Sequence, residues 1–129
     1  MRVLLVEDNP VNQMLAARLL EKFGCRVDLA ANGKEGVDLT ERIPYDVVFM
    51  DWQMPEMDGL AATQAIRLRE SRASTSTEAA FKRLPIIILT ANAMAGDREK
   101  CLASGADHYL SKPFLPDDLR QLLEVYRRA

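Results

Sequence analysis

The sequence predicts an α/β fold in which a five-stranded parallel sheet is covered by helices on both faces. Two short runs, Val47–Met50 and Ile86–Leu89, are apolar throughout, which is typical of strands buried on both faces. Strand-like segments alternate with segments of helical spacing five times along the chain. Such alternation predicts right-handed crossovers and a doubly wound sheet. In such sheets the ligand crevice lies beyond the carboxyl ends of the strands.

The first predicted helix is bounded by clear signals on both sides. Asn9 and Pro10 follow the first strand and are typical of a helix cap and a first helical turn, and Gly24 ends the helix. Its apolar residues keep helical spacing, which predicts an amphipathic helix. These residues are Val11, Met14, Leu15, Leu19 and Phe23.

The remaining elements follow in the same manner. Residues 25–30 alternate apolar and charged side chains, which predicts a strand at the edge of the sheet. Asn32 and Gly33 turn the chain into the second helix, Asp58 is expected to cap the third, and Pro116 begins the last. The strands are expected at residues 2–6, 25–30, 47–50, 85–90 and 107–110, and the helices at residues 10–23, 34–42, 60–68, 98–104 and 116–126.

Residues 1–129 are expected to form one domain, since the chain holds no second set of elements. Residues 71–84 are mostly polar and form a longer connection than is usual in compact α/β domains. They predict a mobile insertion.

The composition argues against several classes of function. The 17 basic and 19 acidic residues give a formal net charge of −2, so there is no basic field to attract nucleic acid. The longest uncharged run, residues 84–96, contains proline and glycine and is too short to span a membrane. The chain enters a strand directly, which leaves no room for a secretory signal, and Cys25 and Cys101 match no metal-binding spacing. We therefore expect a cytoplasmic domain that contacts neither nucleic acid nor membrane.

Side chains that could bind a ligand or react lie at the ends of four of the five predicted strands. Glu7 and Asp8 follow the first strand, Asp51 the third and Lys112 the fifth, and Thr90 ends the fourth. Three carboxylates within ~5 Å of one another would repel by ~3 kcal/mol per pair at an effective dielectric constant of about 20. A divalent cation would remove this repulsion, and oxygen ligands with room for water suit Mg²⁺. Together, the metal ion, the amine and the hydroxyl match the charge of a phosphoryl group.

Each of these residues also has a less specific interpretation. Asp51 could be a turn acid, the Glu7–Asp8 pair could complement a helix dipole, Lys112 could be a solvated lysine and Thr90 could simply end a strand. Only their convergence at one edge of the sheet favours a site.

Four stretches of the sequence resemble the receiver domains of two-component response regulators. They are Val6-Glu7-Asp8-Asn9, Met50 to Gly59, Leu89-Thr90-Ala91 and Ser111-Lys112-Pro113-Phe114. The stretches that begin at Asp51 and Thr90 are especially similar to receivers of hybrid sensor histidine kinases. The resemblance spans nearly the whole chain and implies a flavodoxin-like strand order, 2-1-3-4-5.

The resemblance also implies roles for the residues at the strand ends. Asp51 would accept a phosphoryl group from the phosphohistidine of a histidine kinase or a histidine phosphotransfer domain. The domain would then be a phosphoacceptor switch that catalyses its own phosphorylation and slow dephosphorylation, and a hybrid parent chain would be a histidine kinase. Asp8, Asp51 and the backbone carbonyl of Gln53 would hold Mg²⁺, or Mn²⁺ in its place, with Glu7 acting directly or through water. Lys112 would bind a phosphoryl oxygen.

The switch implied by the resemblance involves two further side chains. Phosphorylation adds about two negative charges to an acidic crevice, and Thr90 would move to bond a phosphoryl oxygen while Tyr109 rotates inward. Plain packing of Tyr109 stays open as an alternative, as does a weak homodimer. The peptide bond before Pro113 is expected to be cis. The positions that would tune access and dephosphorylation are Gln53, Ala91 and Asn92.

Two other function classes are compatible with a sheet of this kind. A Mg²⁺-dependent phosphatase of the haloacid-dehalogenase type also uses a strand-end aspartate, but it needs a second aspartate two residues on as general acid, where this chain has Gln53. A flavin-binding module would need a phosphate-binding loop after the first strand, where this chain is acidic.

Overall fold

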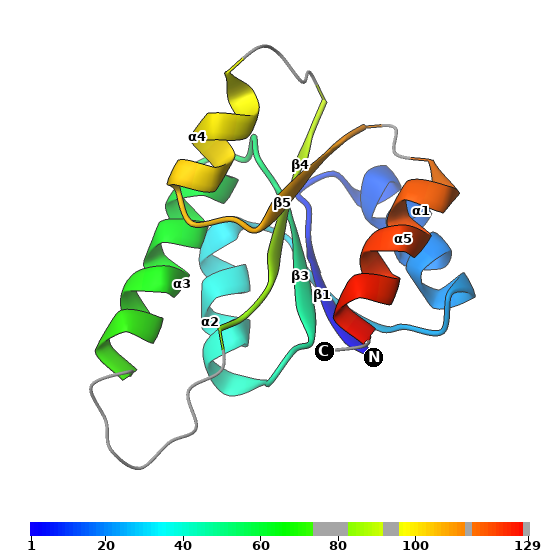
Figure 1. Ribbon diagram of the computed structural model, residues 1–129, viewed down its shortest axis with the longest axis horizontal. Coiled ribbons are helices and arrows are strands. Elements are labelled where there is room, and N and C mark those ends of the chain that lie inside the picture. The colour runs from blue at the N-terminus through cyan, green and yellow to red at the C-terminus, as the bar shows by residue number, and fades with distance from the viewer. Residues whose placement is uncertain (74–82, 92–95, 113–114, 128–129) are drawn as a thin grey trace.

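The computed structural model describes residues 1–73, 83–91, 96–112 and 115–127, in which strands and helices alternate throughout (Figure 1). The strands are β1 (Arg2–Val6), β2 (Arg26–Ala30), β3 (Val47–Asp51), β4 (Ile86–Thr90) and β5 (His108–Ser111). The helices are α1 (Pro10–Lys22), α2 (Gly33–Arg42), α3 (Gly59–Ala73), α4 (Asp97–Ala103) and α5 (Pro116–Arg127).

The strands form one parallel sheet in the order β2-β1-β3-β4-β5. This confirms the predicted fold class and strand order. It also confirms that residues 26–30 form an edge strand, while β3 and β4 in the centre are buried at every position. The apolar runs of β3 and β4 are therefore explained by helices that cover both faces of the sheet.

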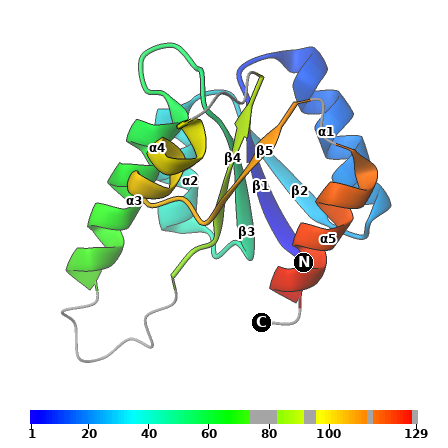
Figure 2. The same cartoon turned by 45° about the horizontal axis from the view of Figure 1, so that its top comes forward.

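Helices α1 and α5 cover one face of the sheet, and α2, α3 and α4 cover the other (Figures 1 and 2). Because successive side chains of a strand point to opposite faces, each central strand supplies both cores. The core beneath α1 and α5 contains Val3, Leu5, Val47, Phe49, Ile87, Leu89, Ala17, Leu20, Leu119 and Leu123. The other core contains Leu4, Val6, Val48, Met50, Ile86, Ile88, Ala62, Ile66 and Cys101.

Helix α1 buries fewer large side chains than its amphipathic pattern suggested. Its buried residues are Ala16, Ala17 and Leu20, so small side chains let the helix lie close to the sheet. The first part of the apolar pattern faces outward instead: Val11, Met14 and Leu15 have exposed fractions of 59%, 47% and 61%.

The two predicted helix caps, Asn9 and Asp58, are confirmed by hydrogen bonds, and Asn32, predicted only as a turn residue, caps α2 as well. The Asn9 side chain accepts from the backbone N–H groups of Val11 and Asn12. Asn32 accepts from Glu35, and Asp58 accepts from Ala61. These bonds satisfy N–H groups that the first turn of a helix leaves without partners.

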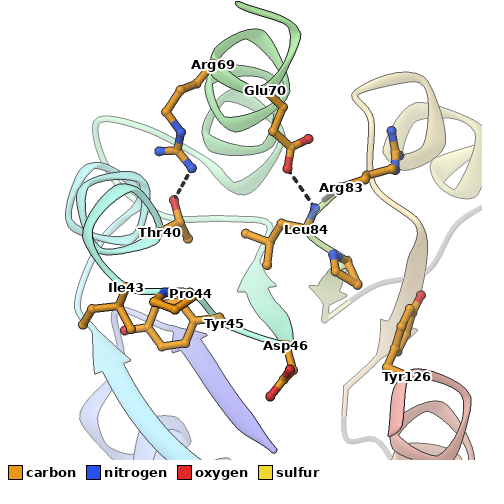
Figure 3. Close-up of a pocket in the computed structure, with 11 residues that line it drawn as sticks. Thr40, Ile43, Pro44, Tyr45, Asp46, Arg69, Glu70, Arg83, Leu84 and Tyr126 are labelled. Carbon is orange, nitrogen blue, oxygen red and sulfur yellow. Dashed lines mark hydrogen bonds between the residues drawn. The ribbon is translucent and has the colours of Figure 1, made fainter. Parts of the chain in front are cut away.

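The long connection between α3 and β4 is tied down at both ends. Helix α3 continues through Ala73, three residues into the predicted insertion at residues 71–84. Glu70, near the end of α3, accepts a hydrogen bond from the backbone N–H of Leu84 at 2.8 Å (Figure 3). Residues 74–82 lie outside the described part of the chain, so the expected mobility of this segment stays a prediction.

Arg67 of α3 is the centre of an ion-pair network at the amino end of β4. Its guanidinium lies 2.8 Å from the carboxylates of both Glu70 and Asp107, and its Nε donates to the Gly105 carbonyl. Asp107 in turn accepts from the backbone N–H of Ile86 at 2.9 Å. The side chains of Arg67 and Glu70 are only 13% and 11% exposed. The network therefore joins α3, the start of β4 and the turn before β5, and it is largely shielded from solvent.

Replacing Arg67 with methionine is expected to lower the free energy of unfolding by about 3 kcal/mol, since it leaves the largely buried Glu70 carboxylate without its cation, while Asp107 keeps its ion pair with Arg83. Arg18→Met, on the exposed surface of α1, is the matched control and should change the free energy by about 0.5 kcal/mol or less. Urea unfolding followed by circular dichroism measures both. Equal losses in the two variants would contradict the importance of the network.

Candidate functional site

The register of the sheet brings the predicted site residues together at the carboxyl ends of the strands, which form one edge of the sheet. Val6 of β1 pairs with Met50 of β3, so Glu7 and Asp51 follow side by side. Asp51 pairs with Leu89, which places Thr90 one residue further along the neighbouring strand. Thr90 pairs with Ser111, the residue before Lys112. The sequence prediction that these strand ends converge is correct.

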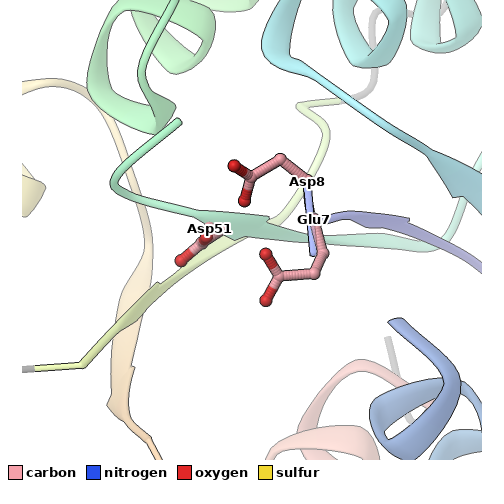
Figure 4. Close-up of side chains that lie close together, drawn as sticks. All are labelled: Glu7, Asp8 and Asp51. Atoms are coloured by element: carbon pink, nitrogen blue, oxygen red, sulfur yellow. The ribbon is translucent and has the colours of Figure 1, made fainter. Parts of the chain in front are cut away.

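Three carboxylates meet at this edge (Figure 4). Oxygen atoms of Glu7, Asp8 and Asp51 all lie within 4.8 Å of one another. Glu7 and Asp51 are buried, with 2% and 7% of their surface exposed, whereas Asp8 is exposed. The cluster therefore has one side in the protein and one side open to solvent.

Lys112 lies between two of these carboxylates. Its ammonium nitrogen is 2.6 Å from Glu7 Oε1 and 3.0 Å from Asp51 Oδ1. The backbone N–H of Lys112 donates to the Thr90 carbonyl at 2.6 Å, which fixes the start of the segment after β5. Lys112 thus supplies positive charge directly to the acidic crevice.

Burial and hydrogen bonding shift the pKa values of Asp51 and Glu7 in opposite directions. Burial, together with a hydrogen bond to Glu7, raises the pKa of Asp51 to about 6. Burial acts to raise the pKa of Glu7 as well, but hydrogen bonds with Lys112 and Asp51 and the charge of Lys112 outweigh it and lower that pKa. For Lys112, burial lowers the pKa, but its two carboxylate partners more than compensate and raise it. At neutral pH Lys112 is therefore charged, and its closest partner, Glu7, is ionised.

The loop after Asp51 lies against the strand end. The backbone N–H of Gly59 donates to the Trp52 carbonyl at 2.7 Å. A Cβ atom on Gly59 would collide with the Asp51 carbonyl oxygen, so only glycine permits this approach. Glu56, between them, has φ +69° and is spanned by a hydrogen bond from Met57 to Pro55. The segment from Trp52 to Gly59 is thus a tight turn that folds back against the end of β3.

The other predicted site residues differ in their exposure to solvent. Gln53 and Ala91 are exposed, and Thr90 is buried. Tyr109 is half-buried and packs against the core beneath α2 and α3. Asn92 and Pro113 lie outside the described residues, so their expected roles stay predictions.

One contact at the site was not expected from the sequence. The side-chain amide of Gln13, in α1, donates to the backbone carbonyl of Glu7 at 2.5 Å. Helical spacing could have indicated this contact, because Gln13 comes four residues after the cap residue Asn9 and so faces the same side of the helix.

The chemistry of this donor set fits a small, hard cation. Carboxylate and carbonyl oxygens are the ligands that Mg²⁺ prefers, and the open side at Asp8 leaves room for the water that Mg²⁺ retains. The oxygens of Glu7, Asp8 and Asp51 lie close enough together to hold such an ion, and the Gln53 carbonyl stays a predicted further ligand. A separate cavity of about 330 Å³ lies at the amino ends of the strands, away from the carboxylates. It is lined by residues such as Tyr45, Asp46, Leu84 and Pro85 (Figure 3).

Comparison with known proteins agrees with this geometry. The family model for the response regulator receiver domain matches residues 3–124. The chain is 43% identical over 122 residues to the sensor protein GacS of Pseudomonas syringae, covering 95% of this chain, and 40% identical over 124 residues to hybrid signal transduction histidine kinase K of Dictyostelium discoideum, covering 96% of it. The chain spans only 13% and 10% of the lengths of these two relatives.

Solved structures show the same similarity. The receiver domain of the sensor histidine kinase PA1611 from Pseudomonas aeruginosa, crystallised with a magnesium ion coordinated in its active-site cleft, is 43% identical with a TM-score of 0.83, over 99% of this chain and 98% of that one. The receiver domain of Saccharomyces cerevisiae Ssk1, solved in complex with the histidine phosphotransfer protein Ypd1, is 32% identical with a TM-score of 0.86, over 98% of this chain and 88% of that one.

Asp51→Asn is expected to raise the free energy of unfolding at pH 7 in metal-free buffer, by on the order of 2 kcal/mol. The pKa of Asp51 is raised in the folded state from 3.8 to about 6, so the folded parent binds the proton more tightly than the unfolded chain. The parent's stability from this group is complete below pH 4 and is lost as the pH rises through 6. The advantage of the variant should therefore develop between pH 4 and 6, as measured by urea unfolding. Asp58→Asn, in the exposed cap, is the control, and a constant difference between Asp51→Asn and parent across this range would contradict the raised pKa.

Proposed function

The chain belongs to the family of response regulator receiver domains of two-component systems, and we propose that it acts as a phosphoacceptor switch with Asp51 as the phosphorylated residue. The observation that best supports this proposal is the environment of Asp51. Its carboxylate ends a central buried strand, lies 3.0 Å from the Lys112 ammonium and lies within 4.8 Å of two further carboxylates.

The transfer we propose is direct. An oxygen of Asp51 attacks the phosphorus of a phosphohistidine, the P–O bond forms as the P–N bond breaks, and the imidazole leaves with the electron pair and takes up a proton. The group is held by Lys112, which exchanges its contacts with Glu7 and Asp51 for a phosphoryl oxygen. Glu7, Asp8, Asp51 and the Gln53 carbonyl would hold Mg²⁺, or Mn²⁺ in its place. The cation would supply positive charge to the transferring oxygens.

The same arrangement provides a basis for switching. The acyl phosphate would add about two negative charges to a crevice that already contains Glu7 and Asp8. Thr90 is one residue beyond the position that pairs with Asp51, and its hydroxyl would bond a phosphoryl oxygen. Tyr109, in the neighbouring strand, would then move inward. The new Thr90 contact is the differential interaction that a population shift requires.

The domain is expected to turn over only its own phosphoryl group. A phosphatase of the haloacid-dehalogenase type would need a proton donor two residues after Asp51, and the Gln53 amide cannot serve as one. The positions that would tune the phosphorylated lifetime are Gln53, Ala91 and Asn92.

A protein partner is favoured by the surface beside the crevice. Val11, Met14 and Leu15 present apolar side chains to solvent on α1. Leu15 also lines a cavity of about 430 Å³ whose other walls include Glu7 and Lys112. An apolar surface that runs up to the phosphorylation site suits a partner that must bring a phosphohistidine to Asp51. We propose that this partner is a histidine kinase or a histidine phosphotransfer domain.

The wider setting of the domain is also proposed from these relationships. In this proposal, residues 1–129 form one receiver domain with an insertion at residues 71–84. The domain acts in the cytoplasm and binds no nucleic acid. None of the described helices is long and apolar enough to cross a membrane. A parent chain, if it is a hybrid kinase, would add the kinase activity. A weak homodimer is compatible with the proposal and is not required by it.

Labelling by radioactive acetyl phosphate tests the phosphoacceptor. Asp51→Asn should abolish incorporation, since the amide cannot attack phosphorus, whereas Asp58→Asn, an exposed residue of the same loop, should label like the parent. Incorporation should stop on addition of EDTA and return with either Mg²⁺ or Mn²⁺. Undiminished labelling of Asp51→Asn would rule out the proposed function.

Transfer from a phosphorylated histidine phosphotransfer protein tests the docking surface. Leu15→Glu should slow transfer at least about tenfold, which corresponds to about 1.4 kcal/mol, while labelling by acetyl phosphate persists. Leu68→Glu on α3, where the native side chain is 55% exposed, is the matched control and should transfer at the parent rate. If the two variants transfer equally fast, α1 is not the docking surface.

A further inference from the structure

The acidic crevice depends on one peptide group just beyond the sheet. β1 ends at Val6, and the next residue, Glu7, donates its backbone N–H to the Ala30 carbonyl at 3.0 Å. The Glu7 carbonyl belongs to the planar peptide unit that joins Glu7 to Asp8. The orientation of this unit, which involves ψ of Glu7 and φ of Asp8, therefore helps to set where the Asp8 side chain lies relative to Glu7.

Gln13 holds this peptide unit from the helix side. Its Nε2 donates to the Glu7 carbonyl at 2.5 Å and lies 3.5 Å from the Ala30 carbonyl that receives the Glu7 N–H. The side chain is half-buried. Gln13 is itself fixed in the first turns of α1 by a backbone hydrogen bond to Asn9 at 2.9 Å. The amide thus connects a rigid helix to the turn that carries two of the three carboxylates.

We propose that Gln13 is a positioning residue for the metal site, which it serves by fixing the Glu7–Asp8 peptide. This inference rests on the proposed function and extends it to a residue that touches neither the cation nor the phosphoryl group. Without the amide donor, the Glu7 carbonyl must turn toward water, and Glu7 and Asp8 then sample more orientations. Loss of such a supporting hydrogen bond typically weakens metal binding by a factor of ten or more.

The test compares Gln13→Met, which removes the donor and keeps the length of the side chain, with Gln121→Met on the exposed face of α5. Mg²⁺ titration is followed by the fluorescence of Trp52, the single tryptophan, which adjoins Asp51. Gln13→Met should raise the dissociation constant for Mg²⁺ about tenfold, while Gln121→Met leaves it unchanged. At saturating Mg²⁺ the rate of labelling by acetyl phosphate should return close to that of the parent, since the reacting groups are intact.

An unchanged dissociation constant in folded Gln13→Met would overturn the inference while leaving the phosphoacceptor role of Asp51 intact. Failure of the parent itself to bind Mg²⁺ would overturn the inference together with the proposed metal site. If Gln13→Met does not fold, amide hydrogen exchange in the parent decides the matter. The Gln13 side-chain amide should exchange more slowly than that of Gln121 and slow further on addition of Mg²⁺, and equal exchange of the two amides would overturn the inference.

Discussion

The charge balance between Lys112 and the carboxylates of Glu7 and Asp51 is the interaction on which the site depends. Two buried acids side by side would be costly, and each would favour its neutral form. The ammonium at 2.6 and 3.0 Å from them removes much of that cost. Yet it leaves Asp51 with a pKa raised to about 6, whereas the pKa of Glu7 is lowered. The residue proposed to be phosphorylated is thus the less well stabilised of the two anions. A bound cation would therefore stabilise the Asp51 carboxylate.

The sheet makes this arrangement possible by providing a rigid edge. β3 and β4 are buried along their whole length, and the side chains of each central strand alternate between two helical layers. Polar atoms can therefore gather only where the strands end. Because the strands are parallel, those ends coincide, and residues more than 100 positions apart, such as Glu7 and Lys112, come into contact. The chemistry follows from topology as much as from the individual side chains.

Much of this architecture could be predicted from the sequence because its signals are strong and local. The unbroken apolar runs of β3 and β4, the caps Asn9 and Asp58, and the turn at Asn32 each correspond to one physical cause. Strand ends identified the acids, Thr90 and Lys112 without any knowledge of distance.

The features that could not be predicted depend on how residues distant in the sequence pack against one another. Helical spacing alone did not reveal that α1 rests on Ala16 and Ala17 and turns Val11 and Leu15 outward. The direct pairing of Lys112 with Glu7, and the hydrogen bond from Gln13 to the Glu7 carbonyl, are side-chain contacts with no sequence pattern of their own.

The tying of the α3–β4 connection at Glu70 and Leu84 has a practical consequence for work with this protein. Both ends of the connection are held at the amino edge of the sheet, and a five-residue strand of roughly 16 Å separates that edge from the acidic crevice. A fluorophore, an epitope or added residues inserted between positions 74 and 82 would attach to anchored chain ends and leave the reactive edge undisturbed. The connection is thus a natural attachment point for probes that report on the domain while it works.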